Sequence, residues 1–189
     1  MYNEVSEFQS PSRMRGLWRL DVQILVLPIR VFLRKLEEGS IRRSFAAILC
    51  SSAPFDEAAL HSVGRCLTLL FDDVSSASAG RAFDEQKAGE IRAFFDSLGD
   101  SVDVLYVCCD YGESRSAAIA AVLRRYTDTD EMRIWRDPTY HPNLLVYKTL
   151  CGAFGLRTGR LGLLRRVRIS RRAFRQAVKD AGKRADSVK

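Results

Sequence analysis

The chain has 189 residues, of which 47% are hydrophobic and 28% charged, and this composition is ordinary for one globular domain with a single core. Its five cysteines are an odd number without a C-x-x-C pair, and only two histidines accompany them, which argues against disulfide and zinc frameworks and favours a reduced, cytoplasmic protein. Arg30 interrupts the apolar stretch 24–33 well before the roughly 20 residues that a membrane helix needs. We therefore expect no transmembrane segment.

The net charge of +7 is unevenly distributed along the chain. Residues 156–189 contain twelve Lys or Arg and two Asp, a net charge of +10, so residues 1–155 carry −3. The tail is either a solvated helical appendage or a surface for a polyanion such as nucleic acid, anionic lipid or an acidic protein. We expect an N-terminal extension at 1–19, an α/β domain at 20–155 and a basic, helical tail at 156–189.

Strand and helix patterns alternate along the chain. Four short apolar runs are predicted to be strands, at 20–27, 45–50, 66–71 and 104–107. Helical patterns are found at 28–39, 82–98, 117–123, 142–154 and 170–181, while 54–64 is a weak helix or a loop and 128–141 is irregular. Because strands alternate with helices, we expect a mainly parallel sheet of about four strands, flanked by helices on both faces.

The most informative stretch is residues 104–123, VLYVCCDYGESRSAAIAAVL. A β-branched and aromatic strand runs into a polar loop, and an alanine-rich helix follows the loop directly. Loops of this kind can turn successive backbone N–H groups inward beside a helix N-terminus, which forms an anion site. Five residues separate Cys109 from Arg115 in this loop, and Gly112 lies between them.

The side chains of the loop point to phosphoryl transfer. The loop N–H groups, the helix dipole and the Arg115 guanidinium would all stabilise a thiolate at Cys109. The planar fork of Arg115 matches two oxygens of a tetrahedral oxyanion, and Ser116 can donate to the sulfur, which makes it a better leaving group. The reaction suggested is transfer through a cysteinyl-phosphate. The alternative is an ordinary buried thiol in a strand-turn-helix unit.

Residues 109–116, CDYGESRS, resemble the C-x5-R signature of cysteine-dependent protein tyrosine and dual-specificity phosphatases. Weaker similarity to the small bacterial and phage-type members extends upstream to 69–73 and downstream to 140–143, so the resemblance covers roughly 20–155. It implies the protein tyrosine phosphatase fold, hydrolysis of phosphotyrosine or phosphoserine/threonine in proteins, and chemistry without a cofactor or metal. It also implies a phosphate loop made of Asp110, Tyr111, Gly112, Glu113, Ser114 and Arg115.

The resemblance further implies a general acid, an aspartate about 30 to 40 residues before the cysteine, which protonates the leaving oxygen. Asp73 and Asp72 precede Cys109 by 36 and 37 residues, at the carboxyl end of a predicted strand, where open α/β sheets gather ligand-binding groups. We prefer Asp73, with Asp72 and then Asp84 as alternatives. The aspartate pair can also simply cap a turn.

Several other residues have two interpretations. The family usually has histidine before the nucleophile, but here the residue is Cys108. Cys108 is either a buried thiol at the strand end or a redox partner that captures Cys109 as a disulfide after oxidation to the sulfenic acid. We expect Glu113 to point away from a bound phosphate. Residues that either line the pocket or belong to the core are Trp135, Tyr140 and Asn143.

Two rival functions stay open beside a protein phosphatase. One is a phosphatase-like module that binds phosphorylated ligands with little or no turnover, which the lost histidine favours and Cys109, Ser116 and the paired aspartates oppose. The other is a phosphatase for a nucleotide, an RNA end or an inositol phosphate, recruited by the basic tail.

Overall fold

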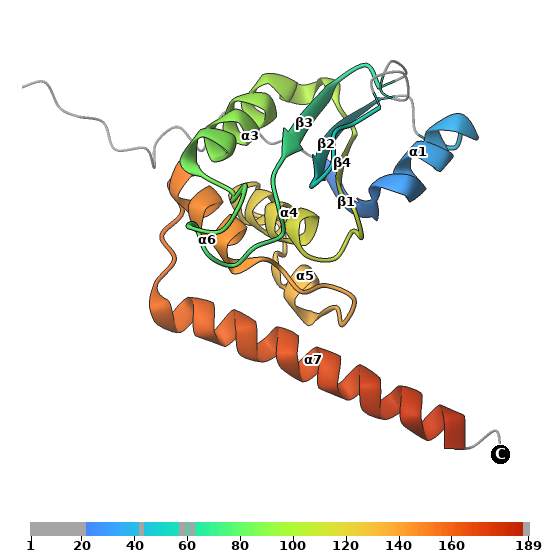
Figure 1. The fold of residues 1–189 in the computed structure, drawn as a ribbon, viewed down its shortest axis with the longest axis vertical. Helices are drawn as coiled ribbons and strands as arrows, with labels where there is room; N and C mark the ends of the chain where they lie inside the picture. The colour runs from blue at the N-terminus through green and yellow to red at the C-terminus, as the bar shows by residue number, and fades with distance from the viewer. Residues whose placement is uncertain (1–21, 42–43, 57–59, 61–62, 187–189) are drawn as a thin grey trace, which may run out of the picture.

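The computed structural model describes residues 22–41, 44–56, 60 and 63–186 (Figure 1). One sheet of four parallel strands, in the order β1-β4-β2-β3, forms the centre of the fold. The strands are β1 (Gln23–Pro28), β2 (Phe45–Ser51), β3 (Cys66–Leu70) and β4 (Val104–Cys109). Strand β4 lies between β1 and β2, and all six of its residues are buried. The expected parallel sheet of about four strands is therefore confirmed.

Helices cover both faces of this sheet. The described helices are α1 (Ile29–Glu37), α3 (Glu85–Leu98), α4 (Arg115–Tyr126), α5 (Met132–Arg136), α6 (Leu144–Ala153) and α7 (Arg160–Asp186), with a short 3-10 turn η2 (Gly99–Ser101) after α3. Helix α1 lies on one face of the sheet, and α3, α4 and α6 lie on the other (Figure 1). Helix α7 runs below α5 and extends beyond it (Figure 1).

The alternation of side chains along β4 divides the core in two. Val104, Tyr106 and Cys108 belong to the cluster under α1, which also contains Phe32. Leu105, Val107 and Cys109 belong to the larger cluster under α3, α4 and α6. Successive side chains of a strand point to opposite faces, and a strand covered on both faces reads as a continuous apolar run. The two adjacent cysteines therefore occupy different cores.

Several element boundaries differ from the sequence predictions. Pro28 ends β1 and caps α1 instead of lying in the first helical turn. Helix α6 begins after Asn143, not at Pro142, because the Asn143 side chain accepts from the backbone N–H groups of Leu145 and Val146 at 2.9 and 3.1 Å. Helix α5 occupies part of the stretch that was expected to be irregular.

The tail helix is longer than its sequence indicates: α7 runs from Arg160 to Asp186, where a helix over 170–181 was predicted. Residues 57–59 and 61–62 of the stretch 54–64, and all of 1–19, lie outside the described residues. None of the helices in the described part of the chain has the length and apolar composition needed to cross a membrane.

Candidate active site

The loop between β4 and α4 lies at the carboxyl end of the central strand. Gly112 has φ +72°, and a Cβ there would lie 2.6 Å from the Pro28 nitrogen, so the loop fits against the junction of β1 and α1 only with glycine at this position. In the described part of the chain, the backbone N–H groups of residues 111–115 donate to no protein acceptor. These N–H groups remain available to a bound anion.

Cys109 and Ser116 meet at the start of this loop. The Cys109 sulfur lies 3.0 Å from the Ser116 hydroxyl oxygen, and both residues are buried. Ser116 occupies the first turn of α4, so the hydroxyl and the helix N-terminus face the same sulfur. The arrangement provides a hydrogen-bond donor for a thiolate at the position where the sequence predicts the nucleophile.

The Arg115 side chain is 3% exposed and is held by three segments of the chain. Its Nη1 donates to the Phe71 carbonyl at 2.7 Å and to the Ser52 hydroxyl at 3.1 Å, and its Nη2 donates to Asp110 Oδ2 at 2.5 Å. A guanidinium has five N–H groups, so one on Nη2 and one on Nε remain. The buried Nε has no partner among the described residues. These two N–H groups are the donors of Arg115 that are left for the oxygens of an anion.

Asp110 compensates the buried charge of Arg115. Partial burial by itself would raise the pKa of the Asp110 carboxyl, but the hydrogen bond and charge of Arg115 outweigh it and lower that pKa below its ordinary value. The backbone N–H of Ser52 also donates to Asp110, at 3.4 Å. Asp110 is therefore a carboxylate that fixes the orientation of the guanidinium.

A second loop, which follows β3, brings Asp73 to the phosphate loop. Oδ1 of Asp73 accepts from the Ser114 hydroxyl at 2.9 Å and from the Asn143 amide at 2.7 Å. Asn143 also donates from Nδ2 to the Val74 carbonyl at 3.0 Å and from its backbone N–H to the Ser114 carbonyl at 3.3 Å. Among the described residues nothing is bonded to Oδ2 of Asp73, and the side chain is exposed. Asn143 thus links three loops at one carboxylate.

The two other candidate aspartates have different partners. Asp72 forms an ion pair with Arg81 at 3.1 Å and also accepts from the Arg81 backbone N–H at 3.2 Å. Asp84 caps α3 by accepting from the Lys87 backbone N–H at 2.9 Å, and the hydrogen bonds from Lys87 lower the pKa of this carboxyl. Each of these carboxylates is engaged by a cation nearby in the sequence, Arg81 or Lys87, whereas Asp73 is linked to the phosphate loop.

The remaining predicted residues are distributed in and around the loop. Tyr111 is 77% exposed, and Glu113 is exposed as well. Trp135 is a core residue, with its ring 5.2 Å from that of Tyr147. Tyr140 is half-buried, and its carbonyl accepts from Ser170 at 3.4 Å. Neither aromatic side chain has a described contact with Cys109.

Cys108 faces the cluster under α1, away from Cys109. Burial and the neighbouring thiols of Cys50 and Cys109 raise the pKa of Cys108 well above its ordinary value, so this thiol stays protonated. Its role as a redox partner stays a prediction, which the opposite directions of the two side chains do not favour. The cysteine that shares the Cys109 face is Cys50, which pairs with Cys109 in the register of β2 and β4.

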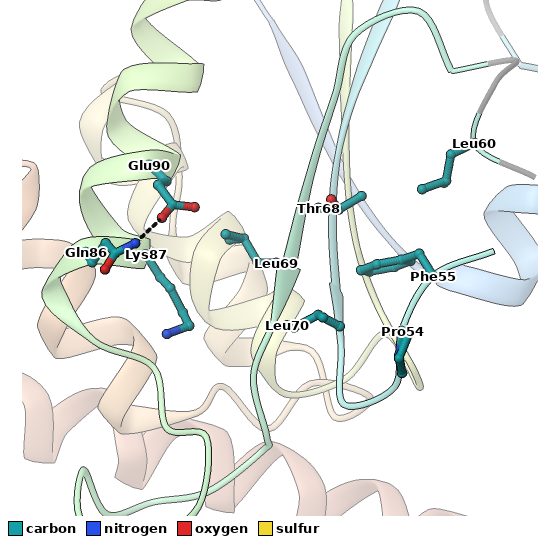
Figure 2. Close-up of a pocket in the computed structure, with 9 residues that line it drawn as sticks. All are labelled: Pro54, Phe55, Leu60, Thr68, Leu69, Leu70, Gln86, Lys87 and Glu90. Atoms are coloured by element: carbon teal, nitrogen blue, oxygen red, sulfur yellow. Dashed lines mark hydrogen bonds between the residues drawn. The ribbon is translucent and has the colours of Figure 1, made fainter. Parts of the chain in front are cut away.

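Two pockets flank β3 without including the phosphate loop. One, of about 420 Å³, runs along β3, with Pro54, Phe55 and Leu60 on one side of the strand and α3, where Gln86 donates to Glu90, on the other (Figure 2). The other, of about 1050 Å³, lies between the loop at 77–84, α3 and α6, and includes Arg81, the partner of Asp72. The described side chains include no group of three His, Cys, Asp or Glu that could hold a metal ion.

Comparison with known proteins finds similar folds among phosphatases. No protein-family model matches the chain, and no curated protein matches it. A solved structure of the Yvh1 phosphatase domain from Chaetomium thermophilum is 19% identical, covering 67% of this chain and 87% of that one, with a TM-score of 0.45. PTPMT1, solved in complex with PI(5)P, is 13% identical over 84% of this chain and 94% of its own, with a TM-score of 0.40.

Tk-PTP, solved in its active form, is also 13% identical, covering 79% of this chain and 90% of its own, with a TM-score of 0.40. At these identities the matches concern the fold alone.

Proposed function

We propose that the chain is a cysteine-dependent phosphatase that hydrolyses phosphomonoesters, with phosphotyrosine or phosphoserine/threonine in proteins as the substrates. The observation that supports this most is the convergence of two reactive features on one loop. The Cys109 sulfur is 3.0 Å from the Ser116 hydroxyl, and the buried Arg115 guanidinium keeps two N–H groups for an anion. An ordinary buried thiol needs neither feature.

In the first step, the Cys109 thiolate attacks phosphorus. The S–P bond forms as the P–O bond to the leaving group breaks, and Asp73 delivers a proton from its unpaired Oδ2 to the leaving oxygen. The loop N–H groups and Arg115 bind the non-bridging oxygens, where negative charge is concentrated in the transition state. The hydrogen bonds from Ser114 and Asn143 to Oδ1 orient the carboxyl group so that Oδ2 carries the proton.

In the second step, water attacks the phosphorus of the cysteinyl-phosphate. Asp73, now a carboxylate, accepts the proton of this water, a new P–O bond forms and the S–P bond breaks. Ser116 donates a hydrogen bond to the departing thiolate, which makes the sulfur a better leaving group. The products are inorganic phosphate and the regenerated thiolate.

The free cysteines support a reduced, cytoplasmic setting for this chemistry. All five cysteines are free thiols. A nucleophilic thiolate is lost on oxidation, and reducing compartments preserve it.

One alternative is a module that binds phosphorylated ligands without hydrolysing them. It is supported by Cys108, which stands where the similar phosphatases usually have histidine. Because burial raises the pKa of the Cys108 thiol, this residue adds neither charge nor a polar partner beside the nucleophile. A second alternative, hydrolysis of a nucleotide, an RNA end or an inositol phosphate, is supported by the +10 charge of residues 156–189.

Hydrolysis assays separate these functions. The substrates are p-nitrophenyl phosphate, phosphotyrosine and phosphoserine peptides, a mononucleotide and an inositol phosphate. We expect Cys109→Ser to abolish hydrolysis while phosphate or tungstate binding persists, because backbone N–H groups and Arg115 hold the anion. Cys66→Ser, which changes a half-buried thiol on β3, is the matched control and should retain activity.

Hydrolysis by Cys109→Ser at the unmodified rate would overturn the covalent mechanism. Anion binding without hydrolysis by the unmodified protein would instead support the binding module. A strong preference for the nucleotide or inositol phosphate over both peptides would support the second alternative.

A further inference from the structure

One side of helix α7 is fixed against the domain. A largely buried ion pair joins Arg166 to Glu131, which lies just before α5. Further along, the buried Ser170 hydroxyl donates to the Tyr140 carbonyl at 3.4 Å, and the Phe174 ring packs edge-on against His141 at 5.0 Å. These contacts determine which side of the helix faces outward.

The outward side carries a continuous row of cations. Residues spaced three and four apart lie on the same side of a helix, with Cβ atoms about 5–6 Å from each other. Five exposed cations follow this spacing along α7, and we name them the arginine stripe: Arg165, Arg168, Arg172, Arg175 and Lys179. With 1.5 Å of rise per residue, the stripe is about 21 Å long.

No cation of the arginine stripe has an ion-pair partner among the residues that the structure describes. Like charges at these spacings destabilise an isolated helix by about 0.2–0.5 kcal/mol per pair, so the stripe weakens α7 on its own. The remaining cations around the stripe, Arg171 and Lys183, are exposed as well. A bound polyanion would remove this repulsion, because its negative charges would neutralise all the cations of the stripe at once.

The composition of the outward face distinguishes between polyanions. A helix that lies in a membrane surface needs an apolar band beside its cations. On α7 the exposed apolar residues are separated into two groups, Leu161 and Leu164 at the start, and Phe174 and Val178 ten residues later, and the Phe174 ring already packs on His141. Every position of the stripe itself is cationic, and four of the five cations are arginine. The planar fork of arginine matches phosphate oxygens, and a regular row of cations suits a polymer with regularly repeating charges.

We propose that the arginine stripe binds the sugar-phosphate backbone of a nucleic acid without reading its base sequence. The helix that carries the stripe is connected to the candidate active site through its inward side. His141, whose ring contacts Phe174, also donates its backbone N–H to the Glu113 carbonyl of the phosphate loop at 2.9 Å. The stripe itself faces away from that loop, so we expect a bound nucleic acid to lie on the outer side of α7. The proposal does not depend on hydrolysis by Cys109, because binding is measured without turnover.

The test is fluorescence anisotropy of the full chain with a labelled single-stranded RNA and a labelled DNA duplex, repeated over a series of salt concentrations. Five phosphate contacts predict a slope of log affinity against log salt of about −3.5 for the single strand and about −4.5 for the duplex. Arg168→Gln with Arg172→Gln should make this slope shallower by about 1.4 and about 1.8 respectively.

The matched control removes two charges elsewhere. Arg34→Gln with Lys35→Gln changes helix α1, where Arg34 is 67% exposed, and gives the same net charge as the α7 variant. We expect this control to keep the slope of the unmodified chain. Equal losses in the two variants would overturn the proposal, since binding would then follow net charge and not the stripe. Hydrolysis of p-nitrophenyl phosphate and the melting temperature check that both variants fold.

Vesicles of phosphatidylserine and phosphatidylcholine form the last arm of the experiment. We expect the chain to bind nucleic acid more tightly than these vesicles at the same salt concentration. Tighter binding to the vesicles, lost on substitution of Arg168 and Arg172, would overturn the nucleic-acid assignment and make α7 a membrane-surface helix.

Discussion

The phosphate loop and helix α7 both concentrate positive charge, but the surroundings of that charge differ. At the loop, Arg115 is buried and donates to Asp110 and to two further oxygens. On α7, the arginine stripe is exposed and has no ion-pair partner in the described part of the chain. A buried charge needs compensation, which fixes its geometry, while an exposed charge responds to salt and to ligands. Substitutions at the loop should therefore change the chemistry, and substitutions on the stripe should change binding.

Among the side chains that surround Cys109 and Arg115, the largest effect is expected for the proposed acid. Asp73→Asn should slow hydrolysis of p-nitrophenyl phosphate by a factor on the order of 10² to 10⁴, because the leaving oxygen loses its proton donor. An alkyl phosphate should be affected more severely, since an alkoxide departs less readily than a phenoxide. Steady-state kinetics on both substrates measure the difference.

Asp72→Asn is the control for this variant. Asp72 is paired with Arg81, so its loss should affect hydrolysis much less. If Asp72→Asn loses as much activity as Asp73→Asn, or more, the acid has been assigned to the wrong residue.

Gly112→Ala tests whether the loop depends on a fixed backbone. A residue with a side chain at φ +72° is strained by roughly 1–3 kcal/mol, and the added Cβ would also lie 2.6 Å from the Pro28 nitrogen. We expect a lower free energy of unfolding together with lost hydrolysis. Gly89→Ala in α3, where a Cβ meets nothing within 4 Å, should stabilise the protein by about 1 kcal/mol. Normal activity in Gly112→Ala would show that the loop is not held against β1.

Truncation after Gly155 removes α7 and tests where the catalytic domain ends. We propose that the catalytic domain is residues 20–155, so the truncated chain should retain most of its activity on p-nitrophenyl phosphate. It should lose about 1–3 kcal/mol of stability, because the largely buried Glu131 loses Arg166. Chemical unfolding measures this loss. A truncated protein that folds but no longer hydrolyses the small substrate would place α7 inside the catalytic domain.

A smaller effect should appear in the pH dependence of stability. Arg115 lowers the pKa of Asp110 despite partial burial, so the ion pair stabilises the fold above the unfolded-state pKa of about 3.9. This contribution is lost as the pH falls through the lower pKa of the folded state. Melting temperatures between neutral and acid pH should therefore fall less steeply for Asp110→Asn than for the unmodified chain. Parallel curves for the two proteins would contradict the pairing.

Much of the fold could be predicted because its signals are local. The apolar runs of the four strands and the helical spacing between them indicated a parallel α/β sheet. The strand order depends on pairings between distant residues, such as Gln23 with Val104, and no local pattern contains that information. The extent of α7 was missed because Gly162 reads as a helix breaker, at a cost of about 1 kcal/mol. The ion pair between Arg166 and Glu131 lies one turn later and stabilises the continued helix.

The candidate site also contains a part with local sequence signals and a part that depends on contacts between distant residues. Cys109, Arg115 and Ser116 are near each other in the sequence, so their spacing was sufficient to group them. The groups that orient Arg115 and the proposed acid come from far along the chain: Ser52 reaches Arg115 across 63 residues, and Asn143 reaches Asp73 across 70. A polar residue directly after a strand, as Ser52 is, or directly before a helix, as Asn143 is, was the available signal.

The formation of a phosphate bond on Cys109 is the most direct test of the proposed chemistry. In Ser116→Ala the departing thiolate loses its hydrogen bond, so the cysteinyl-phosphate should break down more slowly and accumulate. The variant is mixed with p-nitrophenyl phosphate, quenched rapidly in acid and digested for mass spectrometry. We expect a phosphate adduct on the peptide that contains Cys109, and none when the variant also carries Cys109→Ser. Continued hydrolysis with no adduct at Cys109 at any quench time would contradict the covalent mechanism.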